Sequence, residues 1–540
     1  MATPRAFFLD FISLVLVAVL VLCRTPISLV SCGFVDYNES GEYLYAIDNI
    51  YRHAQFYRDY FTAHNALAYY LPAIFFKWTQ PILGSLRYFF YVGWIAQLAV
   101  YGLFVRTLFK SHWIRPVLYL FIANQFWDPY WSTRCGGFRF ALGVCALGSL
   151  CFFAARPRSW LLGICGFFAG ASFLSANDQG ALCLGSCAIF LMIYHYLPSK
   201  DSNPGGFCKS CLMFFAGTVS AWTVLAGLSW FYGWRVPDPL NLSFFVERAR
   251  LIGGTFSFGG RPAAQLAASF LMLLWAFALS INSARCARGQ ERRLRLFAAT
   301  LSVYGFGGLI YSLRYAAGPQ FNGPYALALL MGCYAAVESL NKIPSLQRRW
   351  IGPVVYGVFL IATLSSFVTV CIKKDPPNAW TVDNLRPVDR RIPKIGGTLI
   401  PDVQAKEIED VYAFVQSNST KEDALLGFPD LMFFNSVCDR RAIGRYYVPY
   451  AAFADRTMAH EWLESFSRIR PPVVLVHANL GNAKNYKGRA GAVGKFFLLL
   501  RMNYRLSRQT PSVKIFLKDK VHGWIDRSRI HVRAVPTKGG

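Results

Sequence analysis

The sequence is poor in charged residues, and its acidic residues are scarcer than its basic ones. Asp, Glu, Lys and Arg make up only 16% of the 540 residues, whereas soluble proteins carry about 25%. The 29 acidic and 56 basic residues leave a net charge of +27. Such a charge can indicate nucleic-acid binding, but basic loops beside anionic lipid headgroups explain it better in a chain this apolar. We therefore expect no nucleic-acid partner.

The signatures of several common sites are also missing. The chain has no GxSxG nucleophile elbow, and its glycine pairs are too plain for a phosphate or cofactor loop. Cys208 and Cys211 come closest to a zinc-ligand pair, but no second pair accompanies them. Most of the 14 cysteines lie in apolar segments, where cysteine behaves as a small hydrophobe. Cys438 is the one cysteine of the polar C-terminal region, which excludes a disulfide within that region.

Apolar residues are abundant, and they gather in long runs. They make up 54% of the sequence, in runs of roughly 18–25 residues, the length that crosses a bilayer about 30 Å thick. This pattern predicts an α-helical polytopic membrane protein with about eleven spans. The first run, Phe7 to about Val30, is interrupted by Asp10 and Arg24, so we interpret it as a retained helix rather than a signal peptide. The other predicted spans are Tyr88–Val105, Ile114–Phe126, Phe138–Ala155, Trp160–Leu174, Gly180–Tyr196, Leu212–Phe231, Ala263–Asn282, Leu296–Leu313, Tyr325–Ala336 and Ile351–Ile372.

Basic residues concentrate in alternate loops, which sets the expected orientation. By the positive-inside rule those loops are cytoplasmic, so the intervening loops and everything after Ile372 lie at the outer, periplasmic face of the cytoplasmic membrane. We expect a transmembrane domain at 1–372, with a first outer loop at 31–86, and an outer α/β domain at 373–540. Helices of that domain are predicted at Val403–Gln416, Arg456–Ser467 and Gly494–Arg501, and strands at Ala424–Phe428, Pro472–His477 and Val513–Leu517.

The first outer loop begins with three carboxylates. Asp36, Glu39 and Glu42 could accept a proton from a hydroxyl or bind a divalent cation. They could equally cap a helix, because acidic residues suit a helix N-terminus. The apolar spacing of Ser40–Ala54 predicts that this helix lies on the membrane surface, and Leu67–Lys77 is a candidate for a further dip into the membrane.

A second polar group follows in the same loop. Asp59 is a candidate second carboxylate, and His64 a candidate acid, base or phosphate contact. The structural alternative is a surface pair between Arg58 and Asp59 beside a solvated histidine.

Further candidates lie in other outer loops. Arg134 and Arg139 could clamp a phosphate or simply reach lipid headgroups. Asp178 lies in a short loop that could bind a sugar or form a tight turn, and Arg314 is a similar case. We interpret His460 and His477, in the α/β domain, as structural. The charges avoid the centres of the spans, which favours chemistry at the membrane surface over transport.

The stretch YRDYFTAHNALAYY resembles a motif of the integral-membrane GT-C glycosyltransferases, together with the acidic loop that precedes it. The resemblance is strongest to the bacterial branch that includes protein-mannosyltransferase-like and aminoarabinose-transferase-like enzymes. It departs at Gln55–Phe56 and at Asn65–Ala66, where Gly-Pro is commoner. Weaker similarity lies at Arg139–Leu142, Gly163–Gly180 and Arg314–Pro324. The residues that keep the pattern are Tyr57, Arg58, Asp59, Phe61, His64, Leu67 and Tyr70.

The resemblance implies a donor that is a polyprenyl-phosphate sugar and an acceptor that is a lipid, glycan or protein of the cell envelope. An acidic residue of the first loop would act as general base, with inversion at the sugar and lipid phosphate as leaving group. It implies catalytic roles for Asp36, Glu39 and Asp59. Some relatives use a divalent metal, and nothing in the sequence fixes one. The implied substrate-binding residues are Glu42, Tyr57, Arg58, His64, Arg134, Arg139, Asp178 and Arg314.

Two other functions remain compatible with the sequence. A transporter or flippase of lipid-linked saccharides would share the spans, and so would a non-catalytic membrane scaffold whose C-terminal domain binds a partner. The sequence selects neither the sugar, the acceptor nor the oligomeric state.

Overall fold

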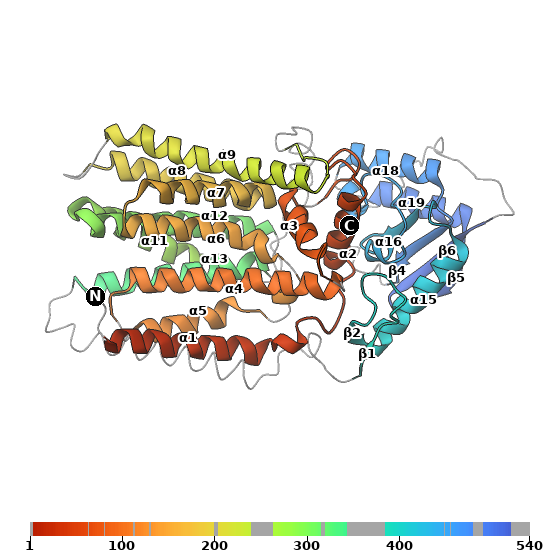
Figure 1. The fold of residues 1–540 in the computed structure, drawn as a ribbon, viewed down its shortest axis with the longest axis horizontal. Helices are drawn as coiled ribbons and strands as arrows, with labels where there is room; N and C mark the ends of the chain where they lie inside the picture. Colours follow the sequence, from red (N-terminus) through yellow and green to blue (C-terminus); the bar gives the residue numbers. More distant parts are fainter. Residues whose placement is uncertain are drawn as a thin grey trace, which may run out of the picture.

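The chain folds into a helical bundle and a smaller sheet-containing part that covers one end of the bundle (Figure 1). We call that end of the bundle the sheet end. The computed structural model describes residues 4–62, 64–79, 82–111, 114–128, 131–134, 136–198, 204–238, 263–314, 319–342, 384–447, 449–453, 455–478 and 490–519.

Helices lie at the positions of the predicted spans, although those at Ile114–Phe126 and Ser159–Ser175 are not among the candidate membrane spans. Each predicted span from Phe7–Val30 to Tyr325–Ala336 coincides with a helix, and Ile351–Ile372 lies outside the described residues. Eight helices of the described part are long and apolar enough to cross a membrane. The bundle consists of α1 (Pro4–Arg24), α4 (Ile82–Leu108), α5 (Ile114–Phe126), α6 (Gly137–Ala155), α7 (Ser159–Ser175), α8 (Asn177–Tyr196), α9 (Phe207–Phe231), α11 (Ala263–Cys286), α12 (Gly289–Arg314) and α13 (Pro319–Leu340).

Close contact between α4 and α6 forms the base on which the polar segments rest. A Cβ atom on Gly93 of α4 would lie 2.2 Å from the carbonyl carbon of Gly137, the first residue of α6. Small residues let two helix backbones approach in this way inside a membrane, where packing rather than the hydrophobic effect drives helix association.

The segment predicted as a first outer loop, 31–86, contains the helix expected at Ser40–Ala54. Half of the segment is helical: α2 (Glu39–Tyr51) and α3 (Leu67–Phe76) lie inside it, and α4 has already begun at Ile82. A 3₁₀ turn (Ile27–Leu29) precedes it. Residues Ser40–Asp48 of α2 are all buried, because α3 and the C-terminal part cover the helix. That this helix lies at the membrane surface stays a prediction.

The C-terminal part is an α/β unit around a four-stranded sheet of order β3-β4-β6-β5. β3 (Leu425–Phe428) and β4 (Val473–His477) are parallel, whereas β6 (Val513–Lys518) runs antiparallel to β4 and to β5 (Tyr504–Gln509). All predicted elements of this region are present. The sequence missed β5, whose solvent-facing YRLSRQ carries two arginines and only weak alternation. The remaining elements are β1 (Leu385–Pro387), β2 (Leu399–Pro401), α15 (Asp402–Asn418), α16 (Phe433–Val437), α17 (Pro449–Ala452), α18 (Arg456–Ile469) and α19 (Ala490–Asn503).

The segment after the first span is bonded directly to the α/β unit. The Gly33 N–H donates to the Leu399 carbonyl at 2.9 Å. The Gln404 side chain pairs with both backbone groups of Val35, each at 2.8 Å. Since hydrogen bonds to both backbone groups fix a residue in place, residues 33–35 are held against α15.

The far end of α2 is held by a buried ion pair. The Lys394 ammonium binds the Asp48 carboxylate and also donates to the Ser436 carbonyl at 2.7 Å. Burial raises the pKa of Asp48, and the neighbouring Lys394 charge opposes that rise. Removing either partner would leave a buried charge without compensation, so this contact ties α2 to the α/β unit.

Replacing Gly41 with alanine should separate α2 from α16. A Cβ atom there would lie 2.3 Å from the Phe433 backbone nitrogen, a contact that only backbone movement can relieve. We expect a loss of about 1–3 kcal/mol of stability, as for other overpacked sites, measured by thermal unfolding of the detergent-solubilised protein. Gly227→Ala in α9 is the matched control, because nothing lies within 4 Å of its Cβ position. Equal melting temperatures for the two variants would contradict the prediction.

Candidate functional site

Asp36 lies at the start of α2 and organises the turn that leads into it. Its Oδ1 accepts the N–H groups of Asn38 at 2.9 Å and Glu39 at 3.1 Å. This is the capping arrangement that the sequence offered as the structural alternative. Asp36 is partly exposed, so a carboxylate at this turn can also meet a ligand.

Asp430 of the α/β unit interacts electrostatically with both Asp36 and His477, and the sequence did not identify Asp430 or His477 as site residues. Asp430 follows β3 after Pro429 and His477 ends β4, so both lie at the carboxyl ends of adjacent parallel strands. Burial raises the pKa of Asp430; the His477 side chain lowers it and the Asp36 carboxylate raises it further. Within the described part of the chain, Asp430 Oδ1 is buried without a hydrogen-bond partner.

A sequence signal for these two residues did exist. Each comes directly at the end of a buried apolar strand, and open α/β sheets bind ligands in the crevice beyond the carboxyl ends of their parallel strands. The parallel pairing of β3 with β4 was not evident from the sequence, because it depends on register between segments about 50 residues apart.

A second group of polar side chains is linked by hydrogen bonds beneath the acidic turn. Glu42 is buried, and its carboxylate accepts a hydrogen bond from the Tyr69 hydroxyl. The Tyr69 oxygen in turn accepts the His64 backbone N–H at 3.2 Å. Arg139 Nη1 contacts the His64 imidazole, 2.9 Å from its Nδ1. The same Arg139 Nη1 also contacts His64 Nε2.

A small pocket adjoins this second group, between α2, α3, α4, α6 and the end of α7. Its cavity volume is only about 10 Å³. Arg139 contributes a cation to a lining that is otherwise mostly aromatic and aliphatic. The lining residues are Tyr43, Leu67, Ala68, Leu71, Phe89, Phe90, Gly136, Phe138, Arg139 and Ser175.

The short turn between α7 and α8 is bonded to the same region. The Asn65 side chain donates to the Phe173 carbonyl at 3.0 Å and to the Asn177 side chain, and its amide oxygen accepts the Tyr57 hydroxyl. The structure therefore brings Tyr57 and the 177–179 turn together. Asp178 accepts the adjacent Gln179 N–H at 2.8 Å, which matches the tight-turn alternative.

Two predicted site residues lie on the surface of their loop. The side chain of Arg58 is 78% exposed and that of Asp59 49%, with 4.0 Å between Nε and Oδ1. Asp59 Oδ2 accepts the Gln55 backbone N–H at 2.7 Å. This matches the surface-pair alternative rather than a buried catalytic carboxylate.

Arg134 and Arg314 are the two remaining arginines among the predicted site residues. Arg134 is almost fully buried, and its Nε donates to the Phe34 carbonyl at 3.2 Å, so it supports the acidic turn from below. The side chain of Arg314 lies outside the described residues. Among the side chains that are described, no three His, Cys, Asp or Glu residues gather as a metal site.

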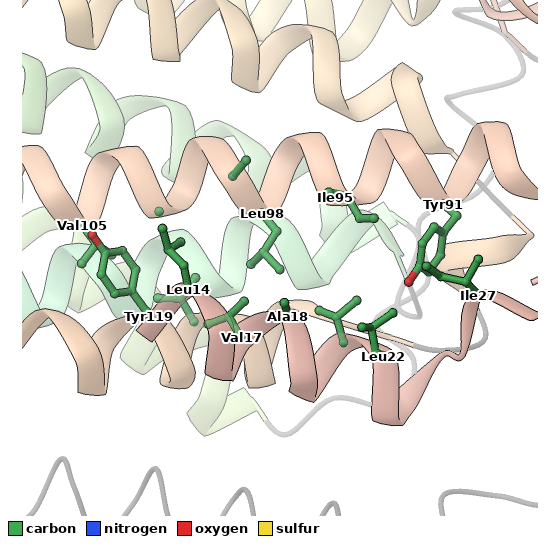
Figure 2. A pocket seen from close by; sticks show the side chains of 14 residues that line it. Leu14, Val17, Ala18, Leu22, Ile27, Tyr91, Ile95, Leu98, Val105 and Tyr119 are labelled. Carbon is green, nitrogen blue, oxygen red and sulfur yellow. The ribbon is translucent and has the colours of Figure 1, made fainter. Parts of the chain in front are cut away.

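A second cavity, between α1, α4 and α5, is almost wholly apolar (Figure 2). Its empty volume is about 890 Å³. Leu14, Val17 and Leu98 are typical of its lining, and Tyr91 and Tyr119 supply the two hydroxyl groups. No carboxylate, imidazole or cation is among its lining residues, so the acid and base groups of a reaction lie elsewhere.

Solved structures of membrane glycosyltransferases share this fold. The oligosaccharyltransferase AglB from Archaeoglobus fulgidus, in complex with an inhibitory peptide and a dolichol-phosphate, matches with a TM-score of 0.57 and 14% identity, over 96% of this chain and 75% of that one. The Archaeoglobus fulgidus oligosaccharyltransferase tethered to an acceptor peptide matches with a TM-score of 0.55 and 12% identity, over 94% and 74%. ArnT from Cupriavidus metallidurans matches with a TM-score of 0.51 and 11% identity, over 95% and 98%.

These matches confirm the GT-C fold that the YRDYFTAH stretch predicted. No protein-family model matches the sequence, and no curated protein matches it significantly.

Asp430→Asn should stabilise the protein more at neutral than at acidic pH. Because the folded-state pKa of Asp430 is raised, its ionisation destabilises the fold, and stability falls as pH rises from the unfolded pKa toward the folded one. Asparagine removes this penalty, so the melting temperature of the variant should exceed that of wild type at pH 7 and approach it at pH 4. The exposed Glu422→Gln is the control. A variant that melts below wild type at pH 7 would contradict the burial of this carboxyl.

Proposed function

We propose that this chain, which has the fold of the GT-C membrane glycosyltransferases, transfers a sugar from a polyprenyl-phosphate donor to a cell-envelope lipid, glycan or protein at the outer face of the cytoplasmic membrane. One observation carries the proposal. The acidic turn at Asp36 leads into α2, and α2 carries Glu42 of the hydrogen-bonded group Glu42–Tyr69–His64–Arg139; α2 lies at the sheet end of the bundle, beside the α/β unit. A dolichol-phosphate bound to the structurally similar AglB supports the lipid-phosphate donor.

We assign the phosphate end of such a donor to Arg139, the one cation among the residues that line the pocket. A guanidinium forms strong, charge-assisted hydrogen bonds with phosphate oxygens. The His64 ring, both of whose nitrogens contact Arg139 Nη1, would lie beside the same phosphate. Leu67, Leu71 and Phe89 then offer apolar surface to the first carbons of the isoprenoid tail. As the bond from the anomeric carbon to the phosphate oxygen breaks, Arg139 would stabilise the charge that develops on the leaving phosphate.

The acidic turn supplies the base. Asp36 or Glu39 would accept the proton of the acceptor hydroxyl while the hydroxyl oxygen bonds to the anomeric carbon from the side opposite the phosphate. The proton thus ends on the carboxylate, and the electron pair of the broken bond leaves with the lipid phosphate. Because the attack comes from the opposite side, the configuration at the anomeric carbon is inverted. The exposed position of Asp59 gives no support to a catalytic role, so the base is assigned to the turn at α2.

Removing either candidate base should slow transfer without unfolding the protein. Asp36→Asn or Glu39→Gln should lower the rate of polyprenyl-phosphate release by about 10²–10⁴-fold, the usual contribution of a general base. The assay supplies purified protein with polyprenyl-phosphate sugars and cell-envelope acceptors. Glu464→Gln on the exposed face of α18 is the matched control. If the wild type releases lipid phosphate and neither turn variant is slower, the base assignment fails.

An inactive wild type would point to another function. If no donor is consumed but lipid-linked saccharides cross vesicles that contain the protein, the chain is a transporter or flippase. If neither occurs, a non-catalytic scaffold is favoured.

Arg139→Gln should weaken donor binding. Loss of a charged hydrogen bond worth about 1.5–3 kcal/mol should raise the donor KM by roughly 10–100-fold. Arg106→Gln, an exposed arginine in the last turn of α4, should leave that KM unchanged. An unaltered donor KM in the Arg139 variant would contradict the placement of the donor phosphate beside Arg139.

A further inference from the structure

One buried arginine holds the chain that leads into the acidic turn. Arg87, in the second turn of α4, is 2% exposed. Its Nη1 donates to the carbonyls of Ser31 at 2.9 Å and Cys32 at 2.6 Å, and its Nη2 to those of Gly33 at 3.1 Å and Phe34 at 2.7 Å. A buried charge is tolerated only when it is well hydrogen-bonded. The four hydrogen bonds of Arg87 go to the carbonyls of four consecutive residues, so its guanidinium holds the segment 31–34 alone.

The same segment is restrained from two further sides. Arg134 Nε shares the Phe34 carbonyl, at 3.2 Å. On the opposite side, Gly33 and Val35 bond to the α/β unit. The chain between α1 and α2 is therefore clamped from below by guanidinium groups and from above by β2 and α15, and Asp36 is the next ionisable residue after the clamp.

The clamp also relates the two halves of the proposed site to each other. Arg134 precedes α6 and contacts the acidic segment, whereas Arg139 lies in the first turn of α6 and contacts His64. The third turn of α4 and the first turn of α6 are in close contact through Phe90 and Gly137. The turn at Asp36 and the pair His64–Arg139 are thus mounted on one rigid base at the ends of two packed helices.

We propose that Arg87 is a positioning residue for sugar transfer: by holding the carbonyls of residues 31–34 it sets the distance between the base at the α2 turn and the donor phosphate at Arg139. This role rests on the proposed function. Arg87 does not touch the reacting atoms, so its loss acts on the geometry of the reaction rather than on donor binding. A misplacement of about 1 Å can cost roughly 10²-fold in rate.

The test compares Arg87→Lys and Arg87→Gln with wild type. Lysine keeps the charge, but its compact ammonium has three donors and cannot span four carbonyls as the planar guanidinium does. We expect kcat for transfer to fall about 10²-fold in both variants while the donor KM changes less than about threefold. Hydrolysis of the donor by water should rise relative to transfer, because the donor stays bound while the base is displaced.

Arg24→Gln is the matched control. Arg24 also donates to two backbone carbonyls, those of Asn124 at 3.2 Å and Trp127 at 3.0 Å, but on the α5 side of the bundle. Its loss should lower the melting temperature and leave kcat per folded molecule unchanged.

Two kinetic outcomes would overturn the role of Arg87. One is a folded Arg87→Lys variant whose kcat and whose ratio of transfer to hydrolysis equal those of wild type. The other is an equal fall of kcat per folded molecule in the Arg24 and Arg87 variants. If wild-type protein consumes no donor, the proposed function fails instead, and amide hydrogen exchange then tests the clamp alone. Exchange at residues 31–38 should be faster in Arg87→Lys than in wild type, and unchanged exchange there would overturn the clamp.

Discussion

Hydrogen bonds between buried guanidinium groups and backbone carbonyls hold this structure together at the point where the first span ends. Where the chain leaves a membrane helix, its backbone N–H and C=O groups lose their helical hydrogen-bond partners. They must then find other partners. Residues 31–34 do so through Arg87 and Arg134, and residues 33–35 through the α/β unit. Because both sets of bonds act on the same few residues, the acidic turn cannot move independently of either the bundle or the sheet.

This constraint explains why α2 is buried. Its N-terminal half packs on α16, and its C-terminal half is held by the Asp48–Lys394 pair. The α/β unit also contributes Asp430, which interacts electrostatically with Asp36 and with His477. The carboxyl end of β3 and the segment that leads into α2 therefore lie close together, although about 400 residues separate them in the chain.

The candidate site was only partly visible in the sequence. The pattern at residues 57–70 made His64 a candidate, and the structure joins it to Arg139, another predicted site residue. The same pattern drew Asp59 into the site, although its carboxylate lies half exposed beside Arg58. One-dimensional spacing cannot separate these cases, because neighbouring loop residues can point into a pocket or out to solvent. Asp430 was missed for a related reason, since its importance depends on which strands pair.

The sequence by itself determined the positions of the bundle helices, three helices and three strands of the C-terminal unit, and the polar character of the region around residues 36–64. These features follow from local hydrophobic periodicity and from the thickness of the bilayer, which act on contiguous residues. Only the tertiary structure decided which polar groups share a site. Arg87 reads as an ordinary interfacial arginine until the carbonyls of residues 31–34 are brought to it, and that contact depends on long-range packing, which no local pattern encodes.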